Sequence, residues 1–156
     1  MIRIVWGTGR GETRSASFDA ALAEANVHQY NLRELSSVIP ADVHLEVVGE
    51  APDLGATGNA VDVAMARQTS PPGSPAAAGI GWARDGDDGP GVFSEVDGHD
   101  PTTVRERLES GVRRGCELRD IDDPAVATRV VSADPSPDRY TTAVVLAVYG
   151  ESRPVL

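Results

Sequence analysis

The sequence predicts an α+β fold, in which helices are laid over mainly antiparallel sheet. Apolar segments of strand length recur along the chain, and turns rich in Gly, Pro and Asp separate them. Only two segments space their apolar residues as a helix does. Aromatic residues make up 4% of the 156 residues, so Val, Ile, Leu and Ala must fill most of the core. This length is typical of one domain, and we expect residues 1–156 to form it.

The start of the chain predicts a strand, a turn and a helix. Residues 2–6 (IRIVW) form the expected buried strand, and residues 7–13 (GTGRGET) a glycine-rich turn. A helix is expected over residues 15–26, with Ser15 or Ser17 as its cap. The apolar stripe of this helix consists of Phe18, Ala21, Leu22 and Ala25.

Seven further segments predict strands, which brings the expected total to eight. They are residues 28–34, 44–48, 59–67, 76–83, 91–96, 125–132 and 140–149. Residues 68–75 and 84–90 are loops by composition. The second of these loops predicts a hairpin tip, whose acidic side chains disfavour aggregation at the sheet edge.

The clearest helix is predicted over residues 101–118. Asp100 is a good N-cap, and Pro101 is a good first residue. The apolar row of the helix repeats every four residues and consists of Val104, Leu108, Val112 and Cys116.

The chain is strongly acidic. Its formal net charge is −10, its pI is near 4.6, and it has Arg but no Lys. Carboxylates hold water and salt screens their repulsion, so this composition favours a protein adapted to high salt. A GC-rich genome that replaces Lys by Arg is the alternative. In both cases strong nucleic-acid binding is excluded, because it needs a basic face.

Other features exclude several further classes of protein. Cys116 is the single cysteine, which excludes an internal disulfide and a multi-Cys zinc site. The apolar run in residues 1–12 is too short for a signal peptide, and no stretch is long enough to span a membrane. We therefore expect a cytoplasmic protein with no membrane and no nucleic-acid partner.

Two other patterns are weak signals of a site. His28, His44 and His99 are far apart in the sequence, whereas a metal site or a Ser-His-Asp site needs such groups together. Residues 7–11 have GxGxG spacing instead of the dinucleotide-binding GxGxxG, and Glu12 would repel a pyrophosphate. A turn built from glycines is the preferred interpretation.

Ser36 and Ser37 form a pair between Leu35 and the segment Val38-Ile39-Pro40. A serine hydroxyl can attack the preceding carbonyl where the backbone is strained and a donor polarises that carbonyl. The amide becomes an ester, β-elimination then breaks the chain, and hydrolysis of the dehydroalanine leaves a pyruvoyl group. Nearby groups must assist, because a hydroxyl is a weak nucleophile. Taken alone, the pair is equally a polar turn.

Several segments together resemble one family. They are residues 11–13 (GET), 18–22 (FDAAL), 31–40 (NLRELSSVIP), 93–98 (FSEVDG) and 114–118 (RGCEL). The chain thereby resembles the archaeal-type pyruvoyl-dependent arginine decarboxylases, in which a run like the third segment is cut between its two serines. The likeness spans most of the chain, and the acidic composition indicates a salt-adapted source.

The resemblance implies a role for each site residue. The chain would be cut between Ser36 and Ser37, and Ser37 would become the covalent pyruvoyl cofactor, with no metal and no pyridoxal phosphate. Asn31 would assist the cleavage. Glu95 would be the proton donor, and Asp19 would bind the substrate guanidinium, which a carboxylate matches with two parallel hydrogen bonds.

The resemblance also implies the architecture and the reaction. The fold would be a four-layer αββα sandwich of mainly antiparallel sheets with two main helices, cut into fragments 1–36 and 37–156. The protein would be a homotrimer with sites between subunits. L-Arginine would be converted to agmatine and carbon dioxide through a Schiff base on the pyruvoyl group, a step toward polyamines.

Alternatives remain open at the level of sequence. Asp97 lies two residues from Glu95, on the same face of a strand, and is a second candidate for the acid. Asp19 is also placed to stabilise the positive end of its helix. Another amino acid is an alternative substrate, and a non-catalytic α+β binding module with the serines as a turn is the alternative to an enzyme.

Overall fold

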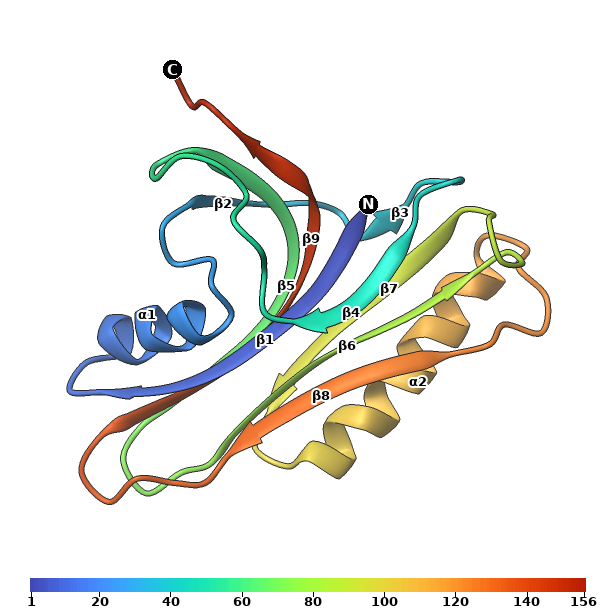
Figure 1. The fold of residues 1–156 in the computed structure, drawn as a ribbon. Helices are drawn as coiled ribbons and strands as arrows, with labels where there is room; N and C mark the ends of the chain where they lie inside the picture. The colour runs from blue at the N-terminus through green and yellow to red at the C-terminus, as the bar shows by residue number, and fades with distance from the viewer.

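The computed structural model describes residues 1–156. It contains two β-sheets packed face to face, with one helix on the outside of each (Figure 1). The helices are α1 (Arg14–Glu24) and α2 (Pro101–Glu117). The predicted α+β sandwich of mainly antiparallel sheets is therefore confirmed. Neither helix has the length and apolar character that crossing a membrane requires.

The first sheet has five strands. They are β1 (Ile2–Gly11), β2 (Asn31–Glu34), β4 (Leu45–Gly49), β5 (Ala60–Ser70) and β9 (Tyr140–Arg153). Their order across the sheet is β2-β5-β9-β1-β4. The central strand β9 pairs antiparallel with β5 and β1, whereas the edge strands β2 and β4 run parallel to their neighbours. The N-terminal strand β1 thus lies inside the sheet.

The second sheet has four strands. They are β3 (Val38–Ile39), β6 (Ala76–Arg84), β7 (Gly91–Gly98) and β8 (Ala127–Ala133). Their order is β3-β7-β6-β8, and every pair is antiparallel. Strands β6 and β7 form the predicted hairpin around residues 85–90. The two-residue β3 was not predicted from the sequence.

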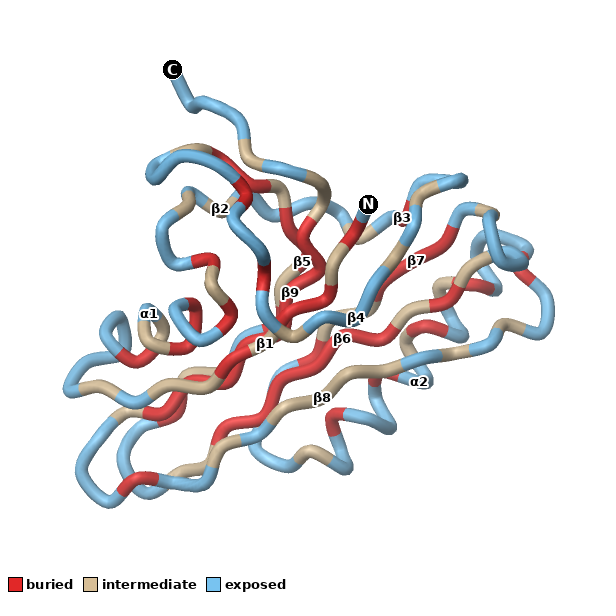
Figure 2. Tube along the Cα trace, viewed as in Figure 1, coloured by how far each residue is buried: buried red, intermediate tan, exposed pale blue.

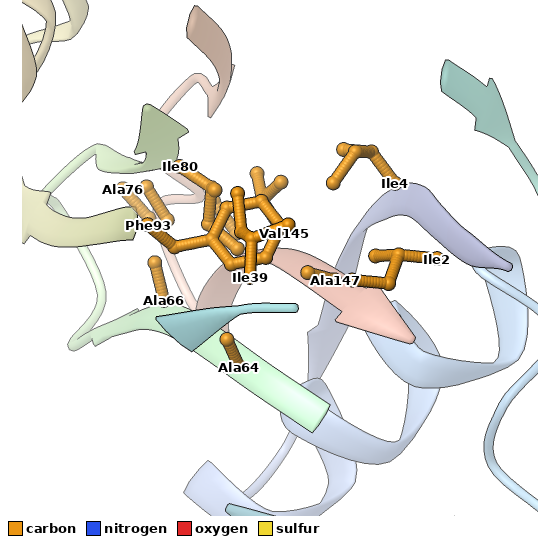
Figure 3. Close-up of a cluster of buried hydrophobic side chains, with 12 residues drawn as sticks. Ile2, Ile4, Ile39, Ala64, Ala66, Ala76, Ile80, Phe93, Val145 and Ala147 are labelled. Carbon is orange, nitrogen blue, oxygen red and sulfur yellow. The ribbon is translucent and has the colours of Figure 1, made fainter. Parts of the chain in front are cut away.

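Small and branched apolar side chains fill the three spaces between the layers. The cluster between the sheets contains one aromatic residue, Phe93, among Ile, Val and Ala (Figure 3). A second cluster lies between α1 and the first sheet, and two smaller clusters lie under α2. Figure 2 shows the buried residues following the inner strands. The predicted core of Val, Ile, Leu and Ala is confirmed.

The glycine-rich turn predicted over residues 7–13 is wrong, because β1 continues through it to Gly11. Each of these residues pairs with β9, as far as Gly11 opposite Tyr140. The glycines let α1 lie directly on the strand: a Cβ on Gly11 would lie 2.6 Å from the Ser17 nitrogen. The glycines thus serve the close approach of two backbones and not a change of chain direction.

A Gly9→Ala substitution is therefore expected to destabilise the fold. The added Cβ would lie 2.7 Å from the Ser17 carbonyl oxygen, so α1 would have to shift. Overpacking of this kind costs about 1–3 kcal/mol of unfolding free energy, which urea or thermal unfolding would measure. Gly98→Ala is the matched control, since the nearest neighbour of its Cβ would be Val104, 3.6 Å away. Equal losses in the two variants would contradict this account.

Several predicted boundaries differ from the structure. Thr13 caps α1 and accepts a hydrogen bond from the Ala16 nitrogen, so the prediction of Ser15 or Ser17 as the cap is wrong. Ser17 is buried instead and shares a 2.7 Å hydrogen bond with Thr142. Residues 28–30 precede β2, and β5 extends to residue 70, into the predicted loop. For α2, the predicted cap at Asp100 and the buried apolar row are confirmed.

Asp62 of β5 binds an arginine from each of the two strands beside it, Arg33 of the edge strand β2 and Arg153 of β9. Its carboxylate accepts from Arg153 Nη2 at 2.7 Å and from Arg33 Nε at 2.9 Å. The hydrogen bond from Arg153, followed by that from Arg33, holds the pKa of Asp62 below its usual value. This ion pair fixes the short edge strand that leads into Ser36 and Ser37.

Candidate active site

Ser36 and Ser37 lie where the chain crosses from the first sheet to the second. On one side, the Leu35 nitrogen donates to the Val63 oxygen of β5 at 2.8 Å. On the other side, the Phe93 nitrogen of β7 donates to the Ser37 oxygen, also at 2.8 Å. The two serines are therefore held from both ends by different sheets. Figure 1 shows this crossing between β2 and β3.

Ser37 has a strained backbone conformation. Its φ is +69°, in the left-handed region that side chains other than glycine's rarely adopt. This conformation costs about 1–2 kcal/mol in a residue with a Cβ. Because hydrogen bonds fix the chain on both sides, the strain is maintained beside the Ser36–Ser37 peptide bond.

The Ser37 side chain contacts Glu95. Its hydroxyl donates a hydrogen bond to Glu95 Oε1. The register of β3 against β7 explains the contact. Val38 pairs with Val92, so Ser37 lies next to the β7 residues that face the other sheet. Burial raises the pKa of Glu95, the Ser37 hydrogen bond offsets part of that effect, and the negative charge of Glu34 raises the pKa further. Glu95 thus holds a proton more readily than an ordinary glutamate.

Tyr149 contacts the same segment from the first sheet. Its hydroxyl donates to the Val38 oxygen at 2.8 Å. Its ring packs edge-on against Phe93, with ring centres 6.1 Å apart. Burial and then the charge of Glu95 raise the pKa of Tyr149 to about 12, so the phenol stays a hydrogen-bond donor near neutral pH.

These groups match the requirements of a nucleophile. The hydrogen bond to Glu95 orients the Ser37 hydroxyl, and the Ser36–Ser37 peptide bond precedes it directly in the chain, at a residue with a strained φ. The Phe93 nitrogen also polarises the Ser37 carbonyl. The Ser37 hydroxyl therefore has the hydrogen-bond partner and the backbone setting of a candidate nucleophile.

Comparison with known proteins places the chain in a family. A family model described as pyruvoyl-dependent arginine decarboxylase matches residues 1–154. The chain belongs to the pyruvoyl-dependent arginine decarboxylase family. This result confirms the resemblance seen in the sequence, and the family is one of carboxy-lyases that depend on a pyruvoyl group.

Individual family members from archaea are similar over nearly the whole chain. A pyruvoyl-dependent arginine decarboxylase of Halobacterium salinarum is 49% identical over 159 residues, covering 99% of this chain and 96% of the relative. One from Methanopyrus kandleri is 29% identical, covering 94% and 93%. One from Pyrococcus abyssi is 30% identical, covering 89% of each. The Halobacterium relative agrees with the predicted adaptation to high salt.

The structure brings together only some of the predicted site residues of this decarboxylase. Ser37 and Glu95 are in contact. Asn31 is exposed at the start of β2, and its side-chain nitrogen donates to the Gly58 oxygen at 2.7 Å. Asp19 is exposed on α1, on the outer side of the first sheet. Neither Asn31 nor Asp19 forms a hydrogen bond with Ser37 within one chain.

The choice between Glu95 and Asp97 now has a geometric basis. Both residues are on the face of β7 that carries Phe93, but only Glu95 contacts Ser37. Asp97 is exposed and lines a separate hollow with Arg14 and Arg67. Of the two carboxylates, Glu95 is therefore the one that the structure brings to the serine pair.

Three contributions to the site were missed in the sequence. The Phe93 nitrogen is a backbone group, and Tyr149 is 111 residues away from the residue whose carbonyl it contacts. Glu34 stands three residues before Ser37, and it influences the pKa of Glu95. Only Glu34 lies within residues 31–40, the segment that contains the serine pair. Its negative charge was the one signal in the sequence that pointed to an effect on the site.

Proposed function

We propose that the chain cuts itself between Ser36 and Ser37 and then decarboxylates L-arginine to agmatine and carbon dioxide. The contact of the Ser37 hydroxyl with Glu95, at a residue with a left-handed φ, carries this proposal in a chain of this family. Agmatine would feed polyamine synthesis, and the reaction would take place in the cytoplasm.

The proposed cut starts at the Ser37 hydroxyl. Its oxygen attacks the Ser36 carbonyl carbon, the peptide C–N bond breaks, and the hydroxyl proton passes to the Ser37 nitrogen, while the hydrogen bond to Glu95 orients the hydroxyl. The resulting ester then loses the Ser37 Cα proton, and its Cβ–O bond breaks, leaving the Ser36 carboxylate and a dehydroalanine. Water adds to the imine tautomer of the dehydroalanine and releases ammonia, so a pyruvoyl group remains at the start of residues 37–156.

The side chains around Ser37 fit the second reaction. The pyruvoyl group supplies a carbonyl that withdraws electrons when carbon dioxide leaves the substrate. Glu95 would return a proton to the substrate carbon, and its raised pKa supports this role. The Phe93 nitrogen would hold the carbonyl oxygen of residue 37, as it does in the uncut chain.

Asp19 and Asn31 suggest that the site is completed by a second subunit. Asp19 is exposed on α1, whereas Ser37 leads into the second sheet. We propose a homotrimer in which Asp19 of a neighbouring subunit binds the guanidinium. Asn31 would assist the cut and orient the site, and its exposure leaves it open to a neighbouring subunit.

The intact mass of the purified protein tests this function. Two fragments of 36 and 120 residues are expected, the larger with a pyruvoyl group in place of its first residue. A chain that keeps its full mass in high salt would refute the proposal. Agmatine release from arginine, compared with carbon dioxide release from a panel of other amino acids, then identifies the substrate.

A further inference from the structure

We propose that Tyr149 is a positioning residue, which clamps the segment containing Ser37 before the cut and holds the pyruvoyl-bearing chain end after it. The proposal rests on the function proposed above. It assigns a role to a side chain of the first sheet, which reaches the short strand β3 of the second.

The short length of β3 is the first argument. It contains two residues, Val38 and Ile39, which pair with Val92 and Gly91 of β7. Such a short ladder has few hydrogen bonds to resist movement. The Tyr149 hydroxyl adds a 2.8 Å hydrogen bond to the Val38 carbonyl from the opposite sheet, so both sheets fix the residue after Ser37.

The placement of the Tyr149 ring is the second argument. The ring packs against the cluster between the sheets and edge-on against Phe93, whose nitrogen binds the Ser37 oxygen. Phe93 and Tyr149 therefore hold two successive carbonyls. The Phe93 backbone nitrogen binds that of Ser37, and the Tyr149 hydroxyl binds that of Val38. The phenol, with its pKa near 12, stays protonated and continues to donate at neutral pH.

The clamp has a consequence at each stage. Before the cut, it prevents the segment from relaxing away from the left-handed φ of Ser37. After the cut, residue 37 begins a chain, in which the Phe93 nitrogen binds the carbonyl oxygen of residue 37 and the Tyr149 hydroxyl binds that of Val38. Loss of the hydroxyl should therefore slow self-cleavage and lower kcat, because the reacting carbonyl moves, while KM for arginine changes little.

The test compares Tyr149→Phe with Tyr140→Phe. The second variant makes the same change at the other end of β9, where the Tyr140 ring lies under Arg14. Freshly synthesised chains are followed by mass spectrometry as the two fragments appear. Tyr149→Phe is expected to cut on the order of tenfold more slowly than the native chain, as loss of one hydrogen bond implies. Tyr140→Phe is expected to cut at the native rate.

Further readouts separate positioning from general stability. In the cut enzyme, Tyr149→Phe should lower kcat with KM within about twofold, since the substrate contacts remain. Hydrogen exchange in an uncut Ser37→Ala background should quicken at residues 38 and 39 when Tyr149→Phe is added. Cleavage at the native rate would overturn the proposal, as would a Tyr149→Phe chain that is globally unfolded. A native chain that never cuts would instead refute the proposed function itself.

Discussion

Ser37→Ala is expected to leave the protein as one chain of 156 residues, without decarboxylase activity. The substitution removes the only oxygen that can attack the Ser36 carbonyl from residue 37, and no pyruvoyl group can form without it. The hydrogen bond to Glu95 is also lost. A denaturing gel and the intact mass report the cut, and assay with arginine reports the activity.

Ser36→Ala is the matched control for this variant. Residue 36 contributes a backbone carbonyl to the cut, and alanine has the same carbonyl. Its side chain is exposed, so the fold should not change. We expect two fragments from Ser36→Ala and one chain from Ser37→Ala. Fragments from Ser37→Ala would mean that another residue is the nucleophile.

Glu95→Gln is expected to cut itself and yet lose decarboxylation by at least about a hundredfold, the usual contribution of a general acid. The glutamine side-chain oxygen can still accept from the Ser37 hydroxyl, so the serine stays oriented. An amide, however, has no acidic proton to give to the substrate carbon. The two reactions are measured separately, by intact mass and by agmatine release.

Asp97→Asn is the control for Glu95→Gln. It makes the same change in charge two residues along β7, beside a different hollow. Asp97→Asn should keep both reactions. Full decarboxylation by Glu95→Gln, together with its loss in Asp97→Asn, would transfer the acid role to Asp97.

The raised pKa of Glu95 also sets a pH dependence. With Glu95 as the proposed proton donor, decarboxylation would require its protonated form, so kcat should fall as the pH rises past the raised pKa. Stability has the same sign: the folded state binds the proton more tightly than the unfolded state, so Glu95 destabilises the fold increasingly as the pH rises above its unfolded pKa. Glu95→Gln should therefore weaken the loss of stability toward higher pH.

The sequence predicted those features that depend on local pattern. Period and capping located α2 with its cap at Asp100. The serine pair with its flanking residues predicts the cut between Ser36 and Ser37, which stays a proposal. Residues 7–11 were predicted wrongly, because glycines that admit a helix onto a strand have the composition of a turn. That distinction depends on a contact with α1, which local composition does not contain.

The site was predictable only in part for a similar reason. Glu95 was assigned through a family resemblance, and its neighbour Asp97 could not be separated from it by strand periodicity. The contact with Ser37 depends on the pairing of β3 with β7, and the contact of Tyr149 depends on the packing of one sheet on the other. Both contacts join residues that are far apart in the sequence, so the local spacing of apolar and polar residues does not predict them.

The position of β1 inside the first sheet has a consequence for folding if the chain is cut as proposed. β1 lies between β9 and β4, both of which belong to the larger fragment after the proposed cut. Folding of the uncut chain is a unimolecular process, whereas recovery of the cut protein from denaturant requires two chains to meet. Refolding of the cut protein should therefore depend on concentration. The peptide bond at Ser36–Ser37 would act as a tether, needed for the chain to fold once and dispensable afterwards.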